Sequence, residues 1–532
     1  MAIALNEDNS HFFCWHPREE MTVAGLDAWL DQYAGTQVSE LLFCTNSQRS
    51  NLVSQSRQSV WDGFDPGQGN DQPFFAGMRD HPFFFHWGAR THMRRWVEHV
   101  WLLHQQGIDP YAHWIARSRS HGISPWLSMR MNDVHYVDEP QHPIHDGFWK
   151  AHPEYRRDPE NDPYNGQCFD YGVPEVRAYQ LAYVQELLFR YNMDGFELDW
   201  MRNPFYFRPG MEEAGCAVLT EFVGQVRKLV DQRQRELDHP IKLSARVPSR
   251  PETARGLGME VASWAQKGFV DKLVAAPFLI SDFDMPIERW KELLKDTGVT
   301  LATGLDMSVR LDAGAHNAAH NLETLRGATS SFLDRGADQI YLFNFMDNFP
   351  GGTWGEAYRT SLPAEVYRRL LREIGAPETT AGKSRRHVVS SPDTRAPGEK
   401  KTPMFPRDCP VGERVVFRLP TGPALQGRQQ GQVRLALESQ ATGDTSPLEI
   451  HVNGARCPDA GEIMPLPDGT EPLHAFSVPA GAIKRGENLI EMQNRSQTPK
   501  RLIWVELAVS DSEGKWPLSG VEITSIYPGL GR

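Results

Sequence analysis

The ten-residue run Met193–Arg202 constrains the fold of this chain more than any other segment. It reads Met-Asp-Gly-Phe-Glu-Leu-Asp-Trp-Met-Arg and has the pattern of a short buried strand. Side chains alternate between the two faces of a strand, so Glu197 and Asp199 are predicted to point into the same space. Two carboxylates in one buried space are costly unless they pair with cations, bind a ligand or exchange protons. The run therefore predicts a strand that carries a functional site.

A helix is predicted directly before this strand. Pro174 suits the first position of a helix, and apolar residues then recur at helical spacing from Val176 to Leu188. A helix, a short turn and a strand that ends in acids is the layout of an active site at the carboxyl end of a (β/α)₈ barrel.

The rest of the first 377 residues supports this architecture. Predicted strands alternate with predicted helices, and parallel strands need helical crossovers of this kind. Besides the opening run, the predicted strands are His11–Trp15, Val38–Cys44, Trp126–Met131, Ile241–Val247, Leu273–Phe278, Thr300–Leu305 and Ile340–Phe345. Eight strands predict an α/β fold of the TIM-barrel class over residues 1–377.

Two long loops interrupt this alternation, at 46–91 and at 134–172. Both are rich in aromatic residues, among them Phe83, Phe84, Phe85 and Trp87 in the first loop. Loops of this length in a compact domain are usually lids or binding loops. We expect their aromatic side chains to form subsites for a ligand.

The pattern changes after Gly375. Residues 378–409 show little periodicity and are predicted to be a linker. From residue 410 to 532, short segments with a two-residue alternation are separated by turn residues, which predicts an antiparallel β-sandwich. We expect this second domain to be an accessory to the barrel.

Composition excludes several classes of function. The formal net charge is -12, which argues against nucleic acid as a partner because phosphate binding needs basic patches. No apolar run reaches the roughly 18 residues of a membrane helix. The first ten residues lack the apolar core of a signal peptide. We expect a cytoplasmic protein from the sequence as written, or a secreted or periplasmic one if a signal has been removed. The sequence does not indicate an oligomeric state.

Four carboxylates are candidate catalytic residues. Asp199 lies nearest the carboxyl end of its predicted strand and is the first candidate for a nucleophile or a charge stabiliser. Glu197 lies one inward step deeper, where it could tune the pKa of Asp199 or pair with Arg246 or Arg130. Asp306 and Asp133 follow other strands and are candidates for the acid/base, because glycoside cleavage usually needs two carboxyl groups.

Other polar residues at or near predicted strand ends are candidates for substrate binding. Amide and guanidinium groups in such positions suit the recognition of hydroxyl or carboxylate groups. The candidates are Asn46, Arg130, Asn132, His135, Trp200, Arg202, Arg246 and Asn344, with Asp347 beyond the last strand. The histidines of the 134–172 loop match no metal-site spacing, so we predict no metal and no cofactor.

These motifs resemble the glycoside hydrolase-like family 10 proteins, a broad group of bacterial barrels. The resemblance covers roughly residues 10–375. It rests on Asp194–Trp200, Tyr171–Arg177, Arg130–Asp133 and Glu260–Asp271. It implies a barrel that cleaves sugars, and it leaves the substrate open. The C-terminal region is similar to the jelly-roll modules of polysaccharide enzymes, which either bind sugar or pack on the catalytic domain.

The opening run is also similar to two other barrel signatures. It is close to the chitinase family 18 signature, but Met201 stands in place of the catalytic Glu, so substrate-assisted chemistry is not expected. The strand resembles the one that carries the nucleophilic Asp of α-amylase barrels, which favours Asp199. The next strand offers Arg246 and Arg250 and no Glu, so the resemblance does not identify a general acid.

The sequence leaves three functions to compare. The first is a glycoside hydrolase that cleaves an oligo- or polysaccharide through Asp199 and a second acid. The second is a carbohydrate-binding barrel that has lost the general acid, as Met201 suggests. The third, a metal-dependent hydrolase, depends only on the loop histidines. A second carboxyl about 5 to 10 Å from Asp199 would favour hydrolysis. An arginine that locks Asp199, with no second acid near, would favour binding.

Overall fold

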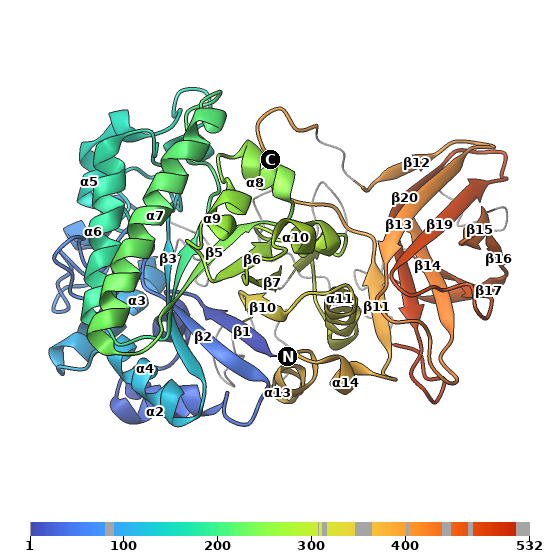
Figure 1. The fold of residues 1–532 in the computed structure, drawn as a ribbon, viewed down its shortest axis with the longest axis horizontal. Coiled ribbons are helices and arrows are strands. Elements are labelled where there is room, and N and C mark those ends of the chain that lie inside the picture. The colour runs from blue at the N-terminus through green and yellow to red at the C-terminus, as the bar shows by residue number, and fades with distance from the viewer. Residues whose placement is uncertain are drawn as a thin grey trace.

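The structure, a computed structural model, describes residues 2–79, 90–306, 308–310, 317–345, 364–400, 404–438, 448–465 and 472–517. It consists of a barrel of strands surrounded by helices and a sandwich of two antiparallel sheets beside it (Figure 1). Among the described helices, none has both the length and the hydropathy that crossing a bilayer requires.

Eight parallel strands close into the barrel, which confirms the predicted TIM-barrel class. The order around the barrel follows the chain, and the last strand pairs with the first. The strands are β1 (Ile3–Glu7), β2 (Val38–Cys44), β3 (Ser124–Arg130), β4 (Gly195–Asp199), β5 (Lys242–Pro248), β6 (Lys272–Ala276), β7 (Thr300–Leu305) and β10 (Gln339–Phe343). A short hairpin of β8 (Ser308–Arg310) and β9 (Asn317–Ala319) follows β7.

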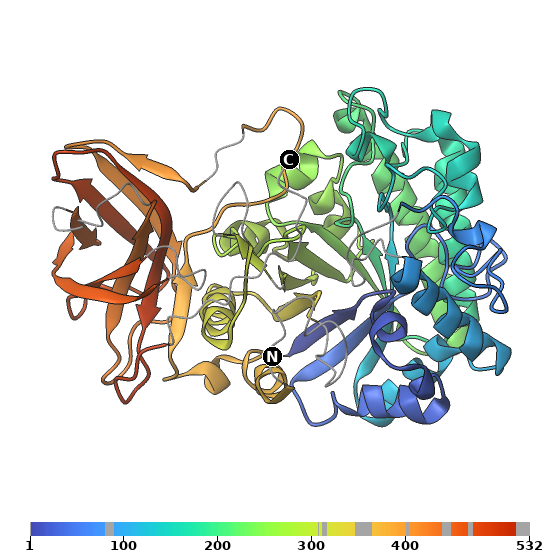
Figure 2. The same cartoon turned by 180° about the vertical axis from the view of Figure 1, so that it is seen from behind.

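Helices cover the outside of the barrel (Figures 1 and 2). The first half of the chain contributes α1 (His11–Trp15), α2 (Val23–Asp31), α3 (Arg90–Gln105), α4 (Pro110–Ser120), α5 (Gly147–Ala151) and α6 (Pro174–Arg190). The second half contributes α7 (Glu212–Leu237), α8 (Pro251–Gly256), α9 (Val261–Gln266), α10 (Ile287–Leu293), α11 (Leu322–Asp334), α13 (Ala364–Glu373) and α14 (Pro377–Thr380). As predicted, Pro174 occupies the first turn of α6, and the buried face of that helix packs in the main hydrophobic core.

The prediction of the first strand was wrong. His11–Trp15 forms the short helix α1, and the barrel begins instead with Ile3–Glu7. All five residues of α1 are buried, and a short run with four consecutive apolar residues has no periodicity that separates a helix from a strand. The carboxyl end of β1, where barrel active sites lie, therefore carries Asn6, Glu7 and Asp8.

The barrel interior contains both apolar side chains and rows of polar and charged side chains. One apolar cluster is made of Ala4, Leu42, Trp126, Met201, Val274, Ala276, Ala302, Tyr341 and Phe343. Ser128, Glu197 and Ser244 lie side by side on β3, β4 and β5. Two residues further on, Arg130, Asp199 and Arg246 form the next row. Charged groups thus gather at the carboxyl end of the strands, where barrel active sites lie.

The C-terminal region forms the predicted sandwich. One sheet has the order β11-β20-β14-β18-β17, with β12 also paired to β20, and the other has the order β13-β19-β15-β16. The strands are β11 (Arg385–Val388), β12 (Arg407–Cys409), β13 (Arg414–Pro420), β14 (Gly431–Leu437), β15 (Leu448–Val452), β16 (Ala455–Cys457), β17 (Asp459–Pro465), β18 (Pro472–Val478), β19 (Glu487–Asn494) and β20 (Lys500–Val509).

The segment 378–409, predicted as a linker, contains two of these strands. β11 and β12 both pair with β20 and so belong to the sandwich. β11 also lies against the barrel helix α11. A Cβ on Gly327 of α11 would lie 1.8 Å from the carbonyl oxygen of Arg386, so the two backbones pack in direct contact. The two domains therefore share a close interface.

Candidate active site

Asp199 ends β4 and is held by the neighbouring strand. Its carboxylate accepts hydrogen bonds from Nη1 of Arg246 at 3.0 and 3.2 Å and from the backbone N–H of Met201 at 2.9 Å. The Arg246 guanidinium lies 3.6 Å from the ring centroid of Phe343 and donates through Nη2 to the carbonyl oxygen of Pro277 at 3.2 Å. Both side chains of the ion pair are at most 2% exposed. Asp199 is thus fixed in orientation by a buried cation.

Glu197 occupies a different environment directly below. Its Oε1 accepts hydrogen bonds from Tyr341 Oη at 2.7 Å, Ser128 Oγ at 2.8 Å and Asn6 Nδ2 at 3.2 Å. No arginine forms an ion pair with it in the described part of the chain, which leaves out the alternative that Glu197 pairs with Arg246 or Arg130. Burial, with the charge of Asp199 in second place, raises the pKa of Glu197 to about 7. Glu197 therefore keeps its proton to a higher pH than an ordinary glutamate does.

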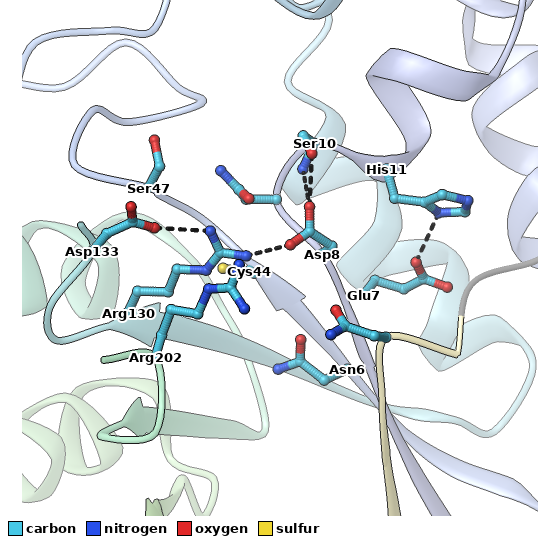
Figure 3. Close-up of polar contacts among 12 residues, drawn as sticks. Asn6, Glu7, Asp8, Ser10, His11, Cys44, Ser47, Arg130, Asp133 and Arg202 are labelled. Atoms are coloured by element: carbon cyan, nitrogen blue, oxygen red, sulfur yellow. Dashed lines mark hydrogen bonds and ion pairs between the residues drawn. The ribbon is translucent and has the colours of Figure 1, made fainter. Parts of the chain in front are cut away.

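A second polar cluster lies across β1 and β3 (Figure 3). Arg130 bridges two acids: it donates through Nη1 to Asp133 Oδ2 at 3.0 Å and through Nη2 to Asp8. Asp8 also accepts hydrogen bonds from the backbone and the hydroxyl of Ser10, at 2.9 and 2.7 Å. Burial opposes ionisation of Asp8, but the charge of Arg130 and the Ser10 bonds outweigh burial and lower its pKa.

Asp133 is also tied to His135. Its Oδ1 accepts from the backbone N–H of His135 at 3.0 Å and lies 2.7 Å from Nδ1 of the same residue. Burial raises the pKa of Asp133, but His135, Arg130 and Arg202 outweigh burial and hold it well below its usual value. Nη2 of Arg202 contacts His135 Nε2, and burial together with this guanidinium lowers the pKa of His135. Asp133 is therefore an ionised group in a paired network.

Asp306 follows β7 and faces the end of β10. Its Oδ2 accepts a hydrogen bond from Nδ2 of Asn344 at 3.2 Å, which brings two predicted site residues together. The Ser281 hydroxyl holds its backbone on both sides, because Oγ donates to the carbonyl oxygen at 2.8 Å and accepts from the N–H at 3.1 Å. Burial lowers the pKa of Arg246, but its acidic neighbours, Asp199 and Asp306 among them, outweigh burial, so the pKa is raised overall. The two acids thus act on one guanidinium.

Three predicted substrate-binding residues have structural contacts: one side chain is buried outside the barrel, and two bond the backbone. Trp200 follows Asp199 directly, so its side chain points to the opposite face, away from the barrel interior. It is fully buried there, with its ring centroid 5.0 Å from that of Tyr206. Asn46 bonds the backbone N–H and carbonyl oxygen of Arg130, at 3.1 and 3.2 Å. Asn132 likewise bonds backbone groups of the loops, so both amides position the chain. Asp347 lies outside the described residues.

The long loops contribute less to the site than predicted. Their described aromatic rings mostly pack inward: Phe75 is 0% exposed, Trp149 2% and Phe169 6%. Tyr164 is an exception at 41% exposed. Phe83, Phe84, Phe85 and Trp87 lie outside the described residues, so the predicted subsites stay a prediction for them.

Several residues of the site were missed by sequence reasoning. They are Asn6, Asp8, Ser128, Tyr341 and Phe343. Asn6 and Asp8 were missed because the first strand was predicted at His11–Trp15. The sequence did carry a signal, because Ile3–Leu5 is followed by Asn, Glu and Asp, which repeats the apolar-then-acidic pattern of β4. The other three point inward on their strands, and only their alternation could have indicated them.

Some of the buried polar atoms without a hydrogen-bond partner belong to residues of this site. Within the described residues they include Asn6 Oδ1, Ser47 Oγ, Glu197 Oε2, Arg202 Nε and Arg246 Nε. Such atoms are uncommon in folded proteins, and a cluster of them indicates a place where a polar ligand completes the bonding. No group of three His, Cys, Asp or Glu side chains in the described ranges could hold a metal ion.

Comparisons with known proteins give only distant similarities. No protein-family model and no curated protein matches the sequence. Among solved structures, the chain is similar to a *Paenibacillus* sp. cycloisomaltooligosaccharide glucanotransferase (10% identity, TM-score 0.33), covering 94% of this chain and 57% of that one.

Two further structures have comparable scores. A chitinase from *Paenibacillus* sp. is 10% identical with a TM-score of 0.38, over 93% of this chain and 52% of that one. An α-L-fucosidase from *Paenibacillus thiaminolyticus* is 13% identical with a TM-score of 0.31, over 93% of this chain and 96% of that one. This chain thus spans little more than half of the first two proteins. The resemblance to the glycoside hydrolase-like family 10 proteins stays a prediction.

Proposed function

We propose that the protein is a glycoside hydrolase that cleaves O-glycosidic bonds of an oligo- or polysaccharide. The observation that carries the proposal is the difference between the two acids of β4. Asp199 is paired with Arg246 at the carboxyl end of the barrel, while Glu197 below it has a pKa raised to about 7. A carboxylate paired with a buried cation and a carboxyl group with a raised pKa are two kinds of group that glycoside cleavage uses. Asp199 is the proposed nucleophile or charge stabiliser.

The second carboxylate is Asp306 in this proposal. A general acid must hold a proton near the working pH. Asp133 suits that role poorly, because its neighbours hold its pKa well below the usual value. The Asp306 carboxylate bonds the Asn344 amide, and its backbone is fixed by Ser281. This arrangement leaves Asp306 as the better of the two predicted acid/base candidates.

Carbohydrate is the substrate class that best matches the rest of the site. The unpartnered polar atoms of the site include donors on Arg202 and Arg246, an acceptor on Asn6, and Glu197 Oε2, which donates when the carboxyl is protonated and accepts when it is ionised. A sugar hydroxyl both donates and accepts hydrogen bonds, so one ligand type can satisfy both kinds of atom.

A second function is favoured by one specific observation. Arg246 forms an ion pair with Asp199, and Arg130 forms ion pairs with both Asp8 and Asp133. A barrel in which Asp8, Asp133 and Asp199 are neutralised in this way could hold a glycan without cleaving it. In that case Asp199 would orient Arg246 toward sugar hydroxyls, and the protein would be a carbohydrate-binding barrel.

A substrate panel separates the two functions. Wild type, Asp199→Asn, Asp306→Asn and the control Asp194→Asn are assayed on polysaccharides and aryl glycosides. Asp194 lies at the other end of β4, paired with Arg119. Hydrolysis predicts that Asp199→Asn and Asp306→Asn each lose roughly 10²–10⁴-fold in kcat/KM, while Asp194→Asn stays near wild type. Turnover unchanged by Asp199→Asn would refute the catalytic assignment. Glycan binding without any turnover would establish the binding barrel.

A further inference from the structure

The segment between β11 and β12 reaches back to the barrel. We call its residues 389–400 the strap. In Figure 1 this part of the chain runs from the top of β11 toward α8 before it returns to β12. The strap belongs in sequence to the C-terminal region, but its side chains Ser390, Asp393 and Glu399 bond residues of the barrel.

Asp393 of the strap binds the loop that follows β6. Its Oδ2 accepts hydrogen bonds from three successive backbone N–H groups, at 3.1 Å from Phe278, 2.6 Å from Leu279 and 3.0 Å from Ile280. Its Oδ1 accepts a further bond from the N–H of Phe278 at 3.0 Å. Successive amides that converge on one carboxylate form an anion-binding concavity. Asp393 therefore fixes the backbone of this loop.

This loop in turn holds the counter-ion of Asp199. Pro277 directly precedes the bound amides, and its carbonyl oxygen accepts from Nη2 of Arg246 at 3.2 Å. Arg246 donates through Nη1 to Asp199 at 3.0 Å. A continuous series of hydrogen bonds and one peptide unit thus connects the strap carboxylate to the proposed nucleophile.

Two other contacts fix the strap independently of Asp393. Ser390 Oγ accepts from the backbone N–H of Phe283 at 2.8 Å. Glu399 accepts from Thr253 Oγ1 of α8 at 3.0 and 3.1 Å. Glu399 therefore offers a matched control, because it is a strap carboxylate that contacts the barrel away from the β6 loop.

We propose that Asp393 is a positioning residue of the active site, supplied by the C-terminal region. It sets the β6 loop, and through Pro277 it sets the position of Arg246 beside Asp199. The C-terminal region then contributes a residue that positions the active site, in addition to any accessory role. The kinetic consequence rests on the proposed glycoside hydrolysis, whereas the structural consequence does not.

The structural part is tested by hydrogen exchange on the full chain. In Asp393→Ala the amide protons of Phe278–Ile280 should exchange at least about tenfold faster, because local opening of that loop becomes easier. Asp393→Asn keeps one acceptor oxygen and should fall between Asp393→Ala and wild type. Glu399→Gln should leave these amides unchanged. Equal exchange in Asp393→Ala and Glu399→Gln would overturn the proposal.

The connection to Arg246 is tested by thermal unfolding. If Asp393 and Arg246 act on each other through the loop, the losses of Tm in Asp393→Ala and Arg246→Lys should not add in the double variant. Additive losses would overturn the connection. Neither measurement requires turnover, so both decide the proposal even if no glycoside is cleaved.

The kinetic part uses the pH profile of kcat/KM on whichever glycoside wild type cleaves. The charged and titratable groups that act on Asp199 or share its cluster are Cys44, Arg130, Glu197, Tyr206, Arg246, Asp306 and Tyr341. Asp393 is not among them. The charge of Arg246 lowers the pKa of Glu197, so if Asp393→Ala loosens Arg246, that pKa should rise and the pH profile should move to higher pH. A reduced rate with an unmoved profile, or the same shift in Glu399→Gln, would overturn the positioning role.

Discussion

Replacing Glu197 by glutamine tests whether this carboxyl holds a proton inside the barrel. Glutamine has nearly the shape of a protonated glutamate, and its oxygen can keep the bonds from Tyr341, Ser128 and Asn6. The substitution therefore removes the titration and keeps most of the packing. Any change of its effect with pH reports on ionisation of Glu197.

The size of the effect follows from the pKa. Burial, and then Asp199, raise the pKa of Glu197 from 4.5 to about 7. At roughly 1.4 kcal/mol for each pH unit, ionising the folded protein costs about 3 kcal/mol more than ionising the unfolded chain. The native pKa is the higher one, so stability is intact below the unfolded pKa and is lost as the pH rises to about 7. Relative to wild type, Glu197→Gln should gain about 2–3 kcal/mol between pH 5 and pH 8.

Urea unfolding followed by tryptophan fluorescence at pH 5 and pH 8 measures this gain. Glu373→Gln is a suitable control. Burial raises the pKa of Glu373, but Lys383, Arg369 and Arg326 outweigh burial and lower it. Its stabilisation is therefore lost only as the pH falls below the usual carboxyl range, and the effect of Glu373→Gln should hardly change between pH 5 and pH 8.

One result would refute the reasoning. If Glu197→Gln differs from wild type by the same free energy at both pH values, Glu197 does not exchange its proton in this range. The distinction between the two acids of β4 would then fail, and with it the main support for the proposed function.

Three further substitutions have defined outcomes. Gly327→Ala places a methyl group against the carbonyl oxygen of Arg386 and should lower the free energy of unfolding by about 1–3 kcal/mol in urea titrations; a neutral effect would contradict the close interface. Arg386→Met removes the cation bonded to Glu506 at 2.5 Å in a fully buried pair and should cost about 3 kcal/mol by the same assay, and adding Glu506→Gln should recover part of it. Ser128→Ala removes a donor to Glu197, which should raise the pKa of Glu197 further and move the loss of stability to higher pH; an unchanged pH dependence would show that this bond does not stabilise the ionised form.

The architecture was predictable from the sequence because its periodicities are strong. The 3.6-residue repeat before Met193 and the two-residue alternation after residue 410 each indicate one kind of element. The first strand was missed because Phe12–Trp15 is a continuous apolar run without a period. β11 was missed because a four-residue strand beside the polar segment 378–384 gives a weak signal of its own.

The site was predictable only where one strand determines the geometry. Alternation places Glu197 and Asp199 on one face, and the same rule, applied one residue further, would have turned Trp200 outward. The partners of each acid could not be read this way. Asn6, Tyr341 and Asp393 come from segments far apart in the sequence, and only the closed barrel and the returning strap bring them together.

The pairing of β20 also decides how the protein can be dissected. One edge of this strand is covered by β11 over Glu506–Val509 and by β12 over Lys500–Leu502. A fragment that starts at residue 410, where the sequence alone suggests the sandwich begins, would lack both and leave that edge open along nearly its whole length. Open edges recruit strands from other molecules, so such a fragment is expected to aggregate. A soluble sandwich has to begin before Arg385, and it then carries the strap with it, so no single cut separates the two domains cleanly.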